Sequence, residues 1–202
     1  MSKAPQITPR PTNDWPASLD EVSADMNGTP INVHKLMAHS PDLLKAWWDF
    51  RNYSVKGGTL GEMLGELVIL RVGVHLGAWY EWASHVDRAH RIGIPITTIN
   101  AVLLRDPTDM FPPDQALILT AVDNLMADGR ILQATLDAMS EHFTTKQIMD
   151  LIAIHGMYVV LGHFIKTWGL ALDDTVLHRI EGLADETTFN EAAKKFADTA
   201  KI

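Results

Sequence analysis

The chain has 202 residues, of which 47% are hydrophobic and 21% charged, and this length and composition suit one globular domain with a well-buried core. Its formal net charge of -8 argues against the basic surface that non-specific nucleic-acid binding requires. It contains no cysteine, which excludes disulfides, thiolate metal sites, iron–sulfur clusters and cysteine nucleophiles.

Residues 1–29 are expected to form an arm and one short helix. The first 18 residues are polar and proline-rich and have no apolar stretch of signal-peptide length, so we expect a cytoplasmic protein. Such an arm is expected to lie over the surface or over a neighbouring subunit. Ser18 followed three residues later by Glu21 is a capping-box pattern, which predicts a helix ending near Met26.

Residues 30–172 carry the main helical patterns. A helix is expected to begin at Pro41 with Ser40 as its N-cap. Helical spacing of apolar residues then covers 60–93, where Gly73 and Gly77 predict a break between two helices. Further helices are expected at 31–38, from Thr97 or Thr98 to 104, and at 114–127, 131–143 and 145–169.

No segment shows the two-residue alternation of a strand, so the chain is expected to be an all-α, single-domain helical bundle. The most apolar stretch, 151–165, is shorter than a membrane span and carries His155 and His163, which indicates a buried helix and no membrane association. Residues 173–202 are expected to form a polar tail with one amphipathic helix at 188–197.

The stretch 65–93 carries the candidate chemistry. Glu81 and His85 are four residues apart and therefore share one helix face. If the chain folds back at the glycines, Glu66 can reach them. A carboxylate beside an imidazole among aromatic side chains can serve as an acid–base pair, because apolar walls raise the pKa of a carboxylic acid and imidazole titrates near neutrality.

Plain structural roles compete with this interpretation. Glu and His at this spacing also form weak pairs on exposed helices, and Glu66 and Arg71 could form a structural ion pair. The candidate substrate-binding residues have structural alternatives as well, since tryptophans often fill cores and histidines often bond to backbone. These candidates are Tyr80, Trp82, Trp79, Arg71, His75 and His155.

No familiar metal or phosphate motif is present. The chain lacks H-E-x-x-H, the E-x-x-H of di-iron proteins, G-x-S-x-G and phosphate-loop signatures. We therefore expect no metal and no cofactor.

The stretch 65–93 resembles the signature segment of the carboxymuconolactone decarboxylase and alkyl hydroperoxidase D-like family. In the hydroperoxidase branch, a glutamate is followed twelve residues later by C-x-x-C and then, four residues on, by histidine. This pattern falls on Glu66, Ala78, Glu81 and His85. Decarboxylase-like members often carry YEW…H, which this chain has at residues 80–82 and 85. Weaker similarity extends the match over roughly residues 30–172.

The resemblance implies a helical bundle of the alkyl hydroperoxidase D-like type, assembled as a homo-oligomer, trimer or hexamer. It does not imply thiol peroxidase activity, because Ala78 and Glu81 stand at the redox-cysteine positions and can neither attack a peroxide nor resolve a disulfide. What remains is a cysteine-free, decarboxylase-like site.

We therefore expect a cofactor-independent lyase or decarboxylase acting on a small carboxylated or aromatic-derived compound, as in aromatic compound catabolism. His85 would be the main general base or acid. Glu81 would be the second proton-transfer group or would orient the imidazole, and Glu66 would tune His85 or pair with Arg71. The alternatives are a hydrolase or isomerase of a lactone on the same scaffold, and a non-catalytic helical oligomer with no cavity between Glu81 and His85.

Overall fold

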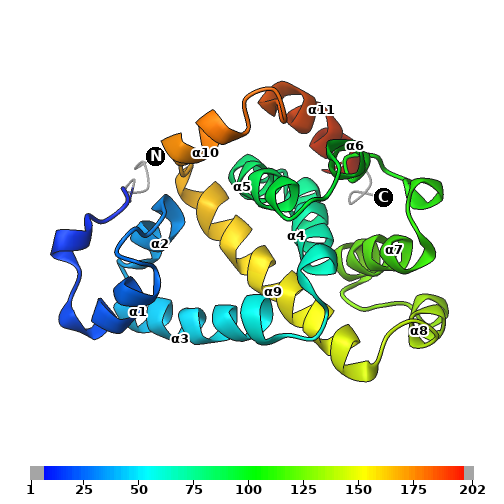
Figure 1. The fold of residues 1–202 in the computed structure, drawn as a ribbon, viewed down its shortest axis with the longest axis horizontal. Coiled ribbons are helices and arrows are strands. Elements are labelled where there is room, and N and C mark those ends of the chain that lie inside the picture. The colour runs from blue at the N-terminus through cyan, green and yellow to red at the C-terminus, as the bar shows by residue number, and fades with distance from the viewer. Residues whose placement is uncertain (1–6, 198–202) are drawn as a thin grey trace, which may run out of the picture.

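The computed structural model describes residues 7–197, and this part of the chain contains helices and no strand (Figure 1). The all-α prediction is therefore confirmed. The α-helices are α1 (Asp20–Asp25), α2 (Asn32–Met37), α3 (Pro41–Asn52), α4 (Glu62–Leu76), α5 (Trp79–Arg91), α6 (Ile96–Ala101), α7 (Pro113–Asp128), α8 (Gln133–Ser140), α9 (Thr145–Trp168), α10 (Asp174–Arg179) and α11 (Glu186–Ala197). A π-helical turn, Tyr53–Gly57, follows α3.

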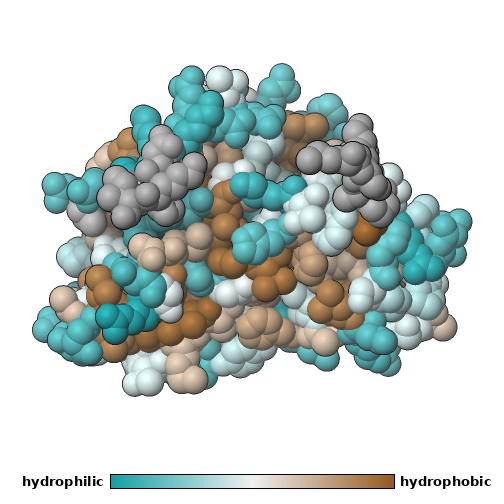
Figure 2. Space-filling view, turned by 180° about the vertical axis from the view of Figure 1, so that it is seen from behind, coloured by the Kyte–Doolittle hydropathy of each residue, from teal (hydrophilic) through white to brown (hydrophobic). Residues whose placement is uncertain are grey.

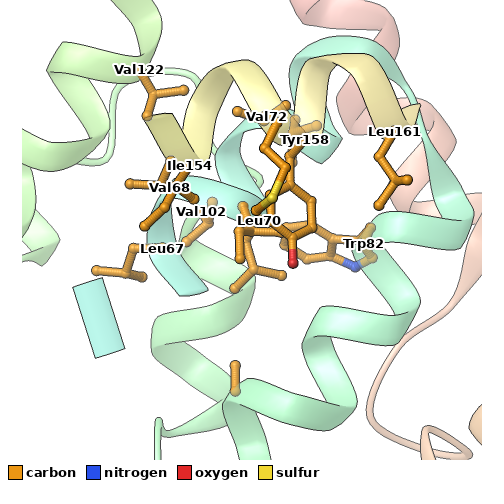
Figure 3. Packing of buried hydrophobic residues seen from close by; sticks show 14 of the residues in the cluster. Leu67, Val68, Leu70, Val72, Trp82, Val102, Val122, Ile154, Tyr158 and Leu161 are labelled. Atoms are coloured by element: carbon orange, nitrogen blue, oxygen red, sulfur yellow. The ribbon is translucent and has the colours of Figure 1, made fainter. Parts of the chain in front are cut away.

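Helix α4 lies at the centre of the bundle, packed against α5, α7, α9 and α11 (Figure 1). It is apolar on nearly every side, and all its residues from Gly65 to Val74 are buried. A helix that is hydrophobic all round belongs in a core. Figure 3 shows Val68 and Val72 of α4 in the packed interior with Val122 of α7 and Ile154 of α9.

The break predicted within residues 60–93 lies at Gly77. This glycine ends α4 in the left-handed conformation (φ 59°), which an L-residue adopts reluctantly, and α5 begins two residues later. Gly73 stays inside α4 and faces the start of α5: a Cβ there would lie 3.5 Å from the Trp82 nitrogen, an ordinary contact distance. This turn brings Glu66 on α4 beside His85 on α5.

Helix α9 has a capping box, in which the Thr144 hydroxyl accepts from the Gln147 amide and the Gln147 side chain accepts from the Thr144 amide. Its 24 residues are long and apolar enough to cross a membrane by length and composition, but half of the most apolar window is buried in the bundle. Figure 1 shows it running through the fold, where it packs against α4. His163 is exposed, so its predicted core position is wrong.

Two predicted caps are wrong, and the predicted start of α3 is confirmed. Ser18 makes no capping hydrogen bond, because α1 follows a short 3₁₀ turn at Ala17–Leu19. Ser40 is the N-cap residue of α3, which begins at Pro41 as predicted, although the Ser40 side chain makes no capping hydrogen bond. Helix α6 begins after Pro95, so Thr97 and Thr98 lie inside it. A proline opens α3 and directly precedes α6, and its fixed φ suits the first turn of a helix.

Residues 173–197 contribute several side chains to the core, although most of the segment is exposed, which corrects the predicted polar tail. Phe189 of α11 is fully buried, with its ring 5.6 Å from those of Trp79 and Trp82. Arg179 of α10 bonds to Asp87 of α5 at 2.9 Å. The predicted helix 188–197 corresponds to α11, and α10 was missed because six residues give too short a periodic pattern.

The described part of the N-terminal arm lies on α2 and on the turn after it. The Arg10 amide donates to the Lys35 carbonyl at 2.9 Å, and its guanidinium donates to the Ala38 carbonyl at 3.2 Å. The beginning of the predicted arm, residues 1–6, lies outside the described residues.

Candidate active site

The centre of the site is His85, held between two glutamates. Its Nδ1 lies 2.6 Å from a carboxylate oxygen of Glu66, and its Nε2 lies 3.7 Å from one of Glu81. The ring meets Tyr158 edge-on at 5.0 Å, and all three ionisable side chains are buried. Because Nδ1 faces the nearer carboxylate, that nitrogen carries the proton of the neutral ring, which leaves the Nε2 lone pair directed toward Glu81.

The carboxylate of Glu66 is held by the side chains of His85 and Arg88. Its Oε2 accepts from His85, and its Oε1 lies 3.2 Å from Nε of Arg88. The ion pair suggested between Glu66 and Arg71 is absent. Arg71 is fully buried elsewhere, where it pairs with Asp123 at 2.6 and 2.7 Å and donates to backbone carbonyls that follow α6.

Glu81 is a buried carboxyl group that lacks a full set of partners. Burial raises its pKa to about 7, with His85 opposing the rise and Glu66 adding to it. Its Oε1 is buried and has no hydrogen-bond partner. At neutral pH this group can therefore either hold or release a proton.

Glu81 and His85 line a cavity of about 70 Å³ between α2, α3, α5 and α9. Polar side-chain atoms that are buried without a partner gather here: Nδ1 of His34, Nε1 of Trp47, Oε1 of Glu81 and Oγ of Ser84. Leaving such a group unsatisfied costs roughly 1–3 kcal/mol. Several of them around one cavity indicate a site made to hydrogen-bond a small polar molecule.

The cavity also has a cationic wall, formed by Arg51 and Arg88. The Arg51 guanidinium lies 4.9 Å from the ring centre of Trp48 and donates to Asn52 at 3.2 Å. Burial, helped by Arg51, lowers the pKa of His34 to about 3, so this imidazole is neutral at physiological pH. The two guanidiniums thus supply the positive charge that would attract an anion.

The predicted substrate-binding residues separate into two groups. Tyr80 lines the cavity, but its hydroxyl donates to Asp173 at 2.5 Å and accepts from the Val33 amide at 3.3 Å, so it also ties α5 to α2 and to the start of α10. The others lie outside the cavity lining: Trp79 and Trp82 pack on Phe189, Arg71 and His75 bond to Asp123, and His155 contacts the sulfur of Met126.

The site contains residues that the sequence analysis did not select. Arg88 follows His85 by three residues on the same helix face, and this spacing could have revealed it. His34, Trp47, Arg51 and Tyr158 come from other helices, and no local pattern connects them to α5.

Within residues 7–197, no group of three or more His, Asp or Glu side chains is arranged to hold a metal ion. That the protein uses no metal or cofactor stays a prediction from the sequence.

Comparison with known proteins agrees with the sequence resemblance. A family model described as "Carboxymuconolactone decarboxylase family" matches residues 41–109, a range that includes Glu66, Glu81 and His85. The resemblance to the carboxymuconolactone decarboxylase family is confirmed. No curated protein matches the chain.

Solved structures show the same fold. A variant of the debrominase Bmp8 in complex with 2,3,4-tribromopyrrole has a TM-score of 0.73 and 16% identity, covering 91% of this chain and 100% of its own. The alkylhydroperoxidase AhpD core protein from Ralstonia eutropha JMP134 has a TM-score of 0.71 and 22% identity, covering 86% and 96%. A peroxidase-related protein from Silicibacter sp. TM1040 has a TM-score of 0.72 and 16% identity, covering 87% and 97%. The fold is therefore of the alkyl hydroperoxidase D-like type.

Proposed function

We propose that this protein is a cofactor-independent enzyme that moves protons on a small anionic compound, with decarboxylation as its reaction. The observation that carries the proposal is the Glu66–His85–Glu81 array: one carboxylate holds Nδ1 at 2.6 Å, while Nε2 faces a second, proton-bearing carboxyl at 3.7 Å. The cavity beside this array also favours an enzyme over a non-catalytic scaffold, for which we expect no cavity between Glu81 and His85.

The roles follow from the contacts. Glu66 orients the imidazole and stabilises its protonated form, and His85 accepts or returns a proton through Nε2. Glu81 supplies the proton that a carbanion takes up. In a decarboxylation, the bond to the departing CO₂ breaks, its electron pair passes into the adjacent carbonyl or conjugated system, and the carbon is then protonated.

Arg51 and Arg88 are proposed to bind the oxygen that becomes negative, or a carboxylate that is retained. They should not hold the departing carboxylate, because a cation on that group would stabilise the ground state and slow the reaction. When one proton is shared between Glu81 and His85, this pair carries no net charge. The negative charge of Glu66 then cancels the positive charge of one arginine, and the other arginine leaves the cavity with a net positive charge. The retained carboxylate, or the oxygen that becomes negative, is proposed to neutralise this remaining positive charge.

The substrate is further proposed to be small and aromatic-derived. The cavity is narrow and has aromatic walls in His34, Trp47 and Tyr158. The similar structure of Bmp8 holds a tribrominated pyrrole, so a ring compound of this size is a suitable probe for the present chain.

A cytoplasmic homo-oligomer, trimer or hexamer, is proposed as the working form. Large hydrophobic side chains are exposed on α3 and α9, among them Phe50, Met149, Ile152 and Val160. Figure 2 shows hydrophobic residues gathered across the middle and lower part of one face, below a hydrophilic upper rim. Exposed apolar surface of this kind is typical of subunit contacts.

Replacement of His85 tests the proposal. His85→Gln should lower turnover by about 10²- to 10⁴-fold, because a general acid–base group contributes on this scale. Turnover of carboxymuconolactone and related lactone and β-keto carboxylates would be followed by NMR in D₂O, as CO₂ loss and deuterium uptake. His90→Gln, at the exposed end of the same helix, is the matched control. Equal turnover by the two folded variants would refute the assignment.

A further inference from the structure

A second cavity, of about 250 Å³, lies on the other side of Arg88. Glu66 and Arg88 form part of its wall, so it adjoins the acid–base site directly. We call it the outer cavity, and we call the one at Glu81 and His85 the inner cavity. Arg88 lines both.

The two cavities follow each other along the same helices. On α5, Glu81 and His85 line the inner cavity and Ile92 lines the outer one. On α9, Tyr158 faces the inner and Ile154 the outer cavity, one helical turn apart. In the segment formed by α3 and the π-helical turn, Arg51 lines the inner cavity and Val55 lines the outer one. The two cavities are thus neighbours along the same helices, and Arg88 is a wall of both.

The outer cavity differs in chemistry from the inner one. Its walls combine the charged side chains of Glu66, Arg88, Lys56 and Glu62 with the aliphatic side chains of Val55, Leu60, Ile69, Ile92 and Ile154. One buried hydroxyl, that of Ser54, has no partner there. The aliphatic side chains give this cavity a surface against which an aliphatic chain or ring edge can pack.

We infer that the outer cavity is a second subsite of the same binding site, and that it holds the apolar part of an anionic substrate whose charged end lies against Arg88 and Arg51. This inference rests on the proposed function, which places the anion in the inner cavity. It adds that the substrate is longer than the inner cavity and that Arg88 lies at the junction of its charged and apolar parts.

Gly65 offers a way to fill the outer cavity without touching the acid–base residues. It lies inside α4 and lines this cavity, and a Cβ there would meet only the Ile154 side chain, at an ordinary 3.7 Å. Gly156, inside α9, is exposed, with nothing within 4 Å of a Cβ. Gly65→Leu and Gly156→Leu therefore form a matched pair, because both replace a mid-helix glycine and only the first occupies the cavity.

The experiment is a calorimetric titration of the wild type and both variants with acetate, butanoate, hexanoate and octanoate. In the wild type and in Gly156→Leu, each added methylene that enters the outer cavity should tighten binding by about fourfold. In Gly65→Leu this gain should disappear, while acetate binding stays within about twofold of the wild type. If Gly65→Leu does not fold by circular dichroism, Gly65→Ala should show a reduced gain.

Two results would overturn the inference: wild-type affinity that does not rise with chain length, or an equal rise in the Gly65 and Gly156 variants. Failure of the proposed function gives a different result, namely full turnover by His85→Gln. If no carboxylate binds the wild type at all, anion recognition at Arg51 and Arg88 is wrong, and the inference falls with it.

Discussion

Two buried carboxyl groups, Asp150 on α9 and Glu81 on α5, have opposite surroundings. Asp150 accepts hydrogen bonds from the Thr59 amide at 2.6 Å, the Thr59 hydroxyl at 2.8 Å and the Tyr53 hydroxyl at 2.9 Å, and it pairs with Lys146 at 3.1 Å. Glu81 faces only His85, at 3.7 Å, and its other oxygen has no partner.

The pKa values diverge accordingly. Burial by itself would raise the pKa of Asp150, but the hydrogen bonds from Thr59, Tyr53 and Lys146 reverse this and lower it to about 2. Burial raises the pKa of Glu81 to about 7, because few donors compensate. A fully satisfied carboxylate holds the fold together. An unsatisfied one is costly to the fold, and its position on a cavity wall indicates a role in chemistry.

The largest effect on stability is expected for Asp150→Ala. It removes the acceptor that ties the π-helical turn at 53–57 and the segment before α4 to α9. Its donors Tyr53, Thr59 and Lys146 are exposed and can bond to water instead. We expect a loss of roughly 3–4 kcal/mol in the free energy of unfolding, measured by urea denaturation at pH 7, because each hydrogen bond to a charged group contributes roughly 1.5–3 kcal/mol before this compensation. Asp49→Asn, on the exposed side of α3, is the control and should change little.

The pH dependence of the two groups should also differ. Because the folded-state pKa of Asp150 is below its ordinary 3.8, its contribution is present above pH 3.8 and is lost as pH falls toward 2. If Asp150→Ala lowers the free energy of unfolding no more than Asp49→Asn does, the hydrogen bonds of Asp150 do not anchor the fold.

A smaller effect, of opposite sign, is expected for Glu81→Gln. Since the folded-state pKa of Glu81 is raised from 4.5 to about 7, the wild type loses stability as pH rises through this window. The glutamine cannot ionise, so the variant should be more stable than the wild type at pH 8 by up to about 3 kcal/mol, and similar to it at pH 4. Urea denaturation at both pH values, with the exposed Glu141→Gln as control, measures the difference. A variant that is less stable at pH 8 would contradict this account of Glu81.

The same comparison shows what sequence could reveal. The spacing of Glu66, Glu81 and His85 predicted their meeting, because a glycine break between two helices fixes which faces oppose each other. The helix patterns likewise predicted nearly every long helix. Both predictions depend on the spacing of residues along the chain, which can be read from a single sequence.

The partners of those residues could not be predicted in this way. That Arg71 would pair with Asp123, and Glu66 with Arg88, depends on how α4 packs against α5 and α7. The contributions of Arg51 and Tyr158 depend on the approach of α3 and α9. The burial of Phe189 and Phe196 was hidden because they are the two large apolar side chains of an otherwise polar helix.

The central claim, that Glu81 is a proton-bearing group at neutral pH, can be measured without knowledge of the substrate. The carboxyl carbon of Glu81 would be followed by NMR in protein labelled with ¹³C at glutamate, from pH 4 to pH 9, and assigned by its absence from Glu81→Gln. The account predicts a titration midpoint near 7. A midpoint at or below the ordinary value of 4.5 would contradict it.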